Sequence, residues 1–108
     1  MQNFYTVVIF VPLTHADILR KVIGDAGAGS VGRYSHCSFS SKGIGRYLPL
    51  KGAKPYQGEV GKLESIEEER IEVICQEDQI TKVIKAMKEV HPYEEPAFYV
   101  YSLLNEDF

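Results

Sequence analysis

The sequence has few cysteines and no long hydrophobic run, and both shortages narrow the class of protein. Cys37 and Cys75 are too few and too far apart in sequence for a disulfide framework. We therefore expect two reduced thiols in a cytoplasmic protein, with Cys75 in the core. No apolar run approaches the roughly 18 residues of a membrane span. The first residues also lack the basic segment of a signal peptide, so we expect neither a leader nor a membrane anchor.

The chain also carries little net charge, because its acidic and basic residues nearly balance. The formal net charge is −3 at pH 7, which gives no basic surface for nucleic acid, so we expect neither a nucleic-acid nor a membrane partner. The chain is 44% hydrophobic and 25% charged, as is usual for a globular protein, and its 108 residues are enough for one domain over residues 1–108. Phosphate-binding motifs are missing too. No Gly-Lys-Ser/Thr follows a suitable glycine spacing, and the glycine pair at 43 and 45 opens no helix.

Hydrophobic periodicity predicts four strands and two helices. Thr14, with Asp17 three positions later, resembles a capping box at the start of the first helix. Gly27 and Gly29 end that helix. We expect strands over residues 4–11, 31–41, 62–76 and 97–104, and apolar helical stripes over residues 18–26 and 80–90.

This order is the βαββαβ pattern of a ferredoxin-like α+β sandwich, in which two helices cover one face of an antiparallel sheet. Right-handed crossovers place the first and third strands at the centre. The second face has no helix, so either Tyr99 and Tyr101 or Phe98 and Val100 face water or a partner. An uncovered apolar face suggests self-association.

The segment over residues 43–61 contains five glycines and two prolines, interleaved with aromatic and aliphatic residues. We expect an ordered excursion with an extended piece at 46–48, because a flexible linker would not carry such side chains. Long ordered loops commonly serve binding or subunit contact. We therefore expect four aromatic side chains to be packed: Tyr34, Phe39, Tyr47 and Tyr56.

The corner over residues 91–96 reads His-Pro-Tyr-Glu-Glu-Pro and joins the second helix to the last strand. Its two prolines stiffen the backbone that holds an imidazole, a phenol and two carboxylates. The simplest interpretation is a helix stop with a solvated acidic turn. The alternative is a site in which His91 and Glu94 or Glu95 line an inter-subunit cleft with residues 34–39, either binding a ligand or pinning the interface.

Four motifs in order carry a resemblance to a known family. They are AGAGSVGRYSHCSF at 26–39, GRYLP at 45–49, PYQGEVGKLE at 55–64 and HPYEEPA at 91–97. Together they resemble the domain inserted into YqfO-type members of the Nif-three-like family, which is similar in fold to CutA and the PII signalling proteins. The resemblance implies a ferredoxin-like protomer that forms trimers through its sheets. The metal-binding halves that flank this domain in the family have no counterpart here, so no dinuclear-metal hydrolase activity carries over.

Three functions follow as hypotheses. The first is a non-catalytic trimeric sensor or regulatory module with a small ligand or metal ion at subunit clefts, bound by Tyr34, His36, Cys37 and Tyr93. The second is a CutA-like protein that binds a divalent metal through His91, Glu94 and Glu95, with His36, Cys37 or His15 added. In a regular strand His36 and Cys37 point to opposite faces, which weakens a site that uses both. The third is an enzyme with Cys37 activated by His91.

Overall fold

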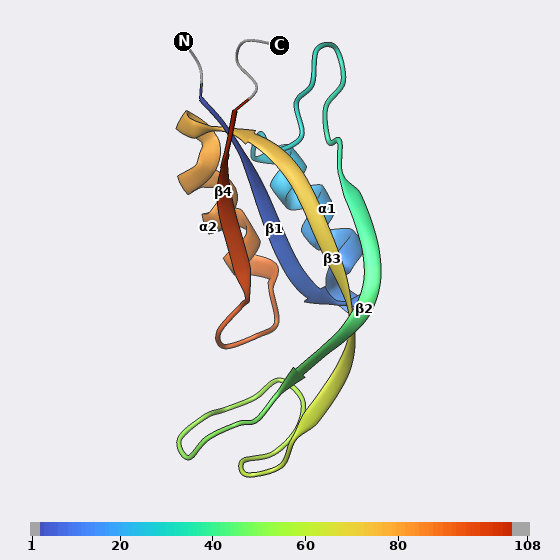
Figure 1. Ribbon diagram of the computed structural model, residues 1–108, viewed down its shortest axis with the longest axis vertical. Helices are drawn as coiled ribbons and strands as arrows, with labels where there is room; N and C mark the ends of the chain where they lie inside the picture. The colour runs from blue at the N-terminus through green and yellow to red at the C-terminus, as the bar shows by residue number, and fades with distance from the viewer. Residues whose placement is uncertain (1–2, 105–108) are drawn as a thin grey trace.

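The computed structural model describes residues 3–104 and consists of one antiparallel sheet and two helices (Figure 1). The sheet has the order β2-β3-β1-β4, so the first and third strands are central, as predicted. Both helices follow a short 3₁₀ turn and pack on one face of the sheet, which confirms the ferredoxin-like α+β fold. The elements are β1 (Phe4–Pro12), η1 (Leu13–His15), α1 (Ala16–Asp25), β2 (Phe39–Tyr47), β3 (Glu64–Gln76), η2 (Glu77–Gln79), α2 (Ile80–Val90) and β4 (Phe98–Leu103).

The core lies between the sheet and the helices. Alternate residues of β1 point into it, because side chains along a strand alternate between faces. The register pairs Val7 with Val73 and Ile9 with Ile71 across the two central strands. Burying each such side chain stabilises the fold by about 1.5–3 kcal/mol. The helical stripes complete this core with Ala16, Leu19 and Ile23 from α1 and Val83 and Met87 from α2.

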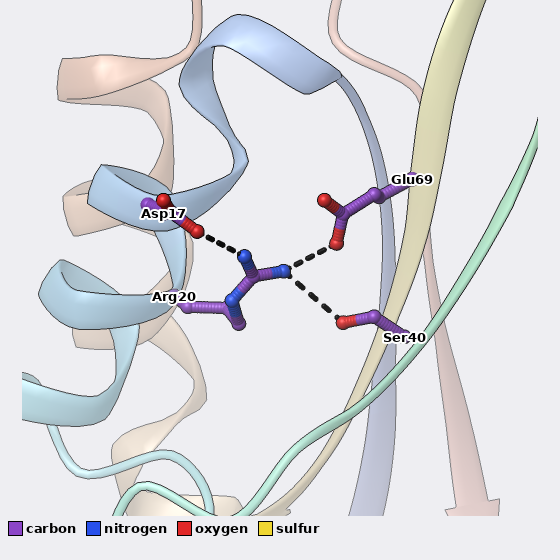
Figure 2. A network of polar contacts seen from close by, with 4 residues as sticks. All are labelled: Asp17, Arg20, Ser40 and Glu69. Carbon is purple, nitrogen blue, oxygen red and sulfur yellow. Dashed lines mark hydrogen bonds and ion pairs between the residues drawn. The ribbon is translucent and has the colours of Figure 1, made fainter.

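An arginine fixes the first helix to the sheet (Figure 2). Arg20 pairs with Asp17 on its own helix and with Glu69 of β3, and its Nη1 donates to Ser40 Oγ of β2 at 3.2 Å. Burial alone would lower the pKa of Arg20, but the hydrogen bonds to Glu69 and Asp17 outweigh it and raise the pKa. The guanidinium therefore stays charged and holds α1 against two strands.

The predicted start of the first helix was wrong in its cap. Thr14 lies in η1, and its Oγ1 contacts His15 Nδ1 at 2.8 Å instead of capping the helix. The helix begins at Ala16 without a side-chain cap, because the 3₁₀ turn already supplies its first hydrogen-bonded turn.

The predicted second strand was also wrong in its bounds. β2 begins at Phe39, whereas residues 31–38 form turns with one isolated bridge between Val31 and Tyr34. Gly32 and His36 have left-handed φ values of 56° and 59°, which interrupt an extended chain. The argument that His36 and Cys37 alternate across a strand therefore does not apply. The loop after β2 accordingly covers only residues 48–63.

Beyond Pro12, β2 and β3 continue without the other strands as a two-stranded ribbon. The pairs run from Ile44 with Glu67 to Tyr47 with Glu64, and Figure 1 shows this ribbon projecting from the sheet toward the 48–63 loop. Among the described residues, none of the helices is long and apolar enough to cross a membrane.

The face of the sheet without helices is called here the open face. Val8 pairs with Tyr99 and Thr6 with Tyr101, so the two tyrosines lie on this face and Phe98 and Val100 on the other. Tyr99 and Tyr101 are 47% and 50% exposed. The open face is therefore accessible in the protomer, and it carries Phe10 and Phe39 as well as the charged Arg70 and Glu72 of β3.

Candidate functional site: an aromatic pocket beside the ribbon

A pocket of about 510 Å³ lies where the ribbon, the 48–63 loop and the 91–96 corner meet. Its walls are mostly apolar and aromatic, with a few polar groups, which is the usual composition of a small-molecule site. Segments far apart in sequence build it, since β1 and β4 contribute as well. The rings in its walls belong to Phe10, Tyr47, Tyr56, Tyr93 and Tyr99.

A buried carboxylate forms part of the pocket wall. Glu68 of β3 is only 8% exposed, and its Oε2 accepts a hydrogen bond from the Tyr93 hydroxyl at 2.6 Å. Gly45 on the neighbouring strand makes room for this carboxylate, because a Cβ there would lie 2.1 Å from Glu68 Oε1. A glycine inside a strand often marks such a close approach.

His91 connects the corner to the central strand. It is 8% exposed, its Nε2 lies 2.8 Å from the Phe10 carbonyl oxygen, and its Nδ1 lies 3.1 Å from the Tyr93 backbone nitrogen. The Tyr93 N–H donates to Nδ1, so Nε2 carries the proton and donates to Phe10. Burial lowers the pKa of His91, with Glu68 opposing that shift. The imidazole is therefore neutral and fully hydrogen-bonded.

Tyr93 stands at the centre of a cluster of rings. Its centroid lies 4.8 Å from His91, 6.0 Å from Tyr56 and 6.5 Å from Tyr47. Burial and the hydrogen bond to Glu68 raise the pKa of Tyr93, so the phenol remains a donor. The Tyr47 hydroxyl in turn donates to the Gln57 carbonyl. The cluster thus fixes the loop against the corner.

The two acidic residues of the corner have different surroundings. Glu94 and Glu95 both line the pocket and are exposed, but only Glu94 accepts the backbone N–H of Lys54, at 3.1 Å, which joins the corner to the loop. Within residues 3–104, no three His, Cys, Asp or Glu side chains are grouped closely enough to hold a metal ion. A metal site at His91, Glu94 and Glu95 stays a prediction, and His91 would have to give up one of its hydrogen bonds.

The other predicted ligand residues lie toward the opposite end of the sheet. Cys37 N donates to Gly29 O, and Gly29 N donates to Ile74 O, beside the start of β1. His36 Nε2 contacts Asp25 Oδ1 at 2.9 Å, at the end of α1. Of the predicted ligand-binding residues, only Tyr93 lines the pocket. Tyr34, His36 and Cys37 do not meet the corner in one protomer, and their meeting across subunits stays a prediction.

The predicted packing of the aromatic residues holds for one of the four and fails for two. Tyr47 is packed in the ring cluster, and Tyr56 joins it while remaining 48% exposed. Tyr34 and Phe39 are 74% and 66% exposed in the protomer, because Tyr34 lies in a surface turn and Phe39 on the open face.

Sequence reasoning missed Glu68, the most buried acid of the site. It lies in the acidic run over residues 64–72, which reads as a solvated strand, so nothing marked one member as buried. The available signal was the glycine at position 45, which the register of the structure places in β2 beside β3.

Known proteins resemble this chain in sequence and in fold. No protein-family model matches the chain. The "GTP cyclohydrolase 1 type 2 homolog" of Halalkalibacterium halodurans is 50% identical over 105 residues, which are 97% of this chain and 28% of that protein. The solved Bacillus cereus "protein related to NIF3" is 51% identical with a TM-score of 0.85, covering 96% of this chain and 26% of that one. The chain is a homologue of one segment of the Nif-three-like proteins.

The chain spans about a quarter of the length of the curated relatives it matches. The "PII-like protein CutA" of Nostoc sp. has a TM-score of 0.68 at 19% identity, covering 100% of this chain and 86% of that one. At that identity the likeness concerns the fold alone, and it confirms the expected CutA/PII-like architecture.

Proposed function

We propose that this Nif-three-like segment is a non-catalytic regulatory or sensor-type module that assembles as a homotrimer and binds a small ligand at subunit clefts. The observation that carries the proposal is the aromatic pocket with its buried Glu68. Its volume of about 510 Å³ falls within the range of small-molecule sites, about 300–1,000 Å³. The two free cysteines support a reducing, cytoplasmic setting.

The open face supports the assembly. Phe10 and Tyr99 pack edge to face on it, with ring centroids 5.5 Å apart, and both also line the pocket. A second copy packed on this face would therefore border the pocket and make it a cleft between subunits. Burying the exposed aromatic side chains of this face removes them from water, which favours association.

Light scattering after size exclusion tests the assembly. We expect three chains for the natural protein and dissociation for Tyr101→Asp, which puts a charge on the open face. Ser102→Asp is the matched control, since the next residue of β4 points to the other face. A monomer at micromolar concentration, or equal effects of both variants, would contradict the trimer.

A thermal-shift screen with nucleotides, amines and other metabolites tests the ligand site. We expect at least one compound to raise Tm, because a ligand at 100 times its Kd stabilises the folded state by about 2.7 kcal/mol. Tyr56→Ala, in the pocket wall, should weaken the response. Leu63→Ala, which is 83% exposed and outside the pocket, should leave it unchanged. A screen without any stabilising compound would count against the proposal.

The two alternative functions have less support in the protomer. A divalent metal at His91, Glu94 and Glu95 requires ligands from a second chain, and metal analysis of the purified protein tests it. A catalytic pair of Cys37 and His91 is not formed, because Cys37 lies near the start of β1 and His91 contacts Phe10 near its end. Burial raises the pKa of the other thiol, Cys75, which makes it a poor nucleophile.

A further inference from the structure

We infer that the aromatic pocket takes an organic cation, an amine or quaternary ammonium compound, rather than an anion or a metal ion. The inference rests on the ligand site proposed above and names its chemical class. Three observations carry it: the balance of charges in the wall, the state of Glu68, and the arrangement of the rings.

The ionisable side chains of the pocket wall favour a cation. Three carboxylates, Glu68, Glu94 and Glu95, line it against one guanidinium, Arg46. The nearby His91 is neutral, because burial lowers its pKa. Walls of one sign raise the local concentration of ligands of the opposite sign. A phosphate or carboxylate ligand would face this excess of negative charge.

Glu68 supplies a fixed anionic acceptor. It is more than nine-tenths buried, and the Tyr93 hydroxyl holds its Oε2. Among the described residues no cation pairs with Glu68, and its Oε1 accepts no hydrogen bond from the protein. No buried polar side-chain atom of the described residues lacks a partner, so Oε1 is accessible to solvent and free to accept a hydrogen bond from a ligand. A ligand N–H⁺, or a quaternary nitrogen beside it, would supply the cation that pairs with Glu68.

The aromatic rings of the pocket wall supply π-systems that can attract a cation. Tyr56 and Tyr47 are tilted by 48° and 52° relative to Tyr93, so none of these pairs is stacked face to face. An ammonium group within about 6 Å of such ring faces is attracted by their quadrupoles. Aromatic walls with a carboxylate recognise quaternary ammonium compounds in this way, because the apolar methyl groups and the charge are both satisfied.

The same arrangement is unsuited to a metal ion. A divalent ion needs several converging donor atoms, and no group of three His, Cys, Asp or Glu ligands occurs in residues 3–104. One fixed carboxylate among rings meets the needs of an organic cation.

Choline and its uncharged isostere 3,3-dimethyl-1-butanol test the inference, because they differ in charge and hardly in shape. Titrations followed by ¹H–¹⁵N spectra report on the backbone amides of Gly45, Leu48 and Tyr93, with sodium chloride as the ionic-strength control. We expect saturable shifts with choline. The alcohol should bind with an affinity at least about tenfold lower. Glu68→Gln should weaken choline binding by about the same factor. Glu67→Gln, on the same strand but on the other face, exposed and outside the pocket, should not.

Several results would overturn the inference. Equal binding of choline and the alcohol would show an apolar pocket without charge selection, and an unchanged affinity in Glu68→Gln would remove the proposed acceptor. If Glu68→Gln does not fold, Tyr56→Leu replaces it, and full choline binding by that variant counts against the ring contacts. Binding of AMP but not of choline at these amides would refute the cation and leave the ligand site intact. If no probe and no compound of the metabolite screen binds in the pocket, both the cation inference and the proposed ligand site are refuted.

Discussion

Two histidines near the ends of the two helices show how differently the same side chain is used. His91 follows α2 and bonds only to backbone groups, the Phe10 carbonyl and the Tyr93 N–H, and is 8% exposed. His36 lies against Gly24 near the end of α1, and its ring nitrogens contact only exposed side chains, those of Asp25 and Ser35. Backbone groups cannot turn away when a partner is lost, whereas surface side chains can turn to water. We therefore expect His91 to carry fold stability and His36 to contribute little.

The largest expected effect is that of His91→Ala. The substitution leaves the Phe10 carbonyl and the Tyr93 N–H without their partner, and each unsatisfied buried group costs about 1–3 kcal/mol. We expect the free energy of unfolding to fall by about 2–4 kcal/mol, measured by urea denaturation. His36→Ala is the matched control, with a loss below about 1 kcal/mol. Equal losses for the two variants would refute the contrast between the two histidines.

The next effect concerns the glycines of β2. Gly45→Ala puts a Cβ 2.1 Å from the Glu68 carboxylate, which must shift and disturb its bond from Tyr93, whereas a Cβ at Gly43 meets nothing within 4 Å. Overpacking of this kind typically costs about 1–3 kcal/mol, so we expect that loss for Gly45→Ala and none for Gly43→Ala. Thermal denaturation of both variants measures the difference. Loss of stability in Gly43→Ala would mean that the strand itself, and not Glu68, requires glycine.

The pH dependence of stability gives a smaller effect. Burial lowers the pKa of His91 below its ordinary value of about 6.5, with Glu68 and His15 as the charged or titratable groups that also act on it. Below pH 6.5 the unfolded chain binds a proton that the folded chain does not, so stability falls as pH falls. The contribution of the neutral His91 imidazole to the stability of the fold is fully present above about pH 6.5. We expect a loss of at most about 1.4 kcal/mol per pH unit between pH 6.5 and 5.5, and a weaker slope in His91→Gln. An equal slope in that variant would assign the effect to other groups.

Much of the fold was predictable, because hydrophobic periodicity determines it locally. The alternation of Ile71, Val73 and Cys75 placed β3 correctly, and the apolar stripes placed both helices. The strand predicted over residues 31–41 was wrong because left-handed residues such as His36 leave no trace in periodicity. Gly45 read as a loop residue, although it lies in β2 under a long-range contact with Glu68.

The candidate site was predictable only in part for the same reason. Tyr93 and the stiff corner followed from local sequence. The partners of His91 and Tyr93 come from β1 and β3, 81 and 25 residues away in sequence. Only tertiary structure brings them together, so the burial of Glu68 could not be inferred from an acidic run.

The smallest expected effect concerns the backbone conformation of His36, the exposed histidine of the two. His36 has φ 59°, a conformation that costs a residue with a Cβ about 1–2 kcal/mol and glycine almost nothing. His36→Gly relieves this strain but loses the exposed contact with Asp25, worth about 0–1 kcal/mol, and gains freedom in the unfolded chain. We expect these terms to nearly cancel, so that the free energy of unfolding of His36→Gly lies within about 0.5 kcal/mol of that of the natural protein. His36→Ala keeps the strain and loses the contact, so it should be the less stable variant of the two. The reverse order in urea denaturation would mean that the imidazole itself, and not the backbone it is attached to, maintains this turn.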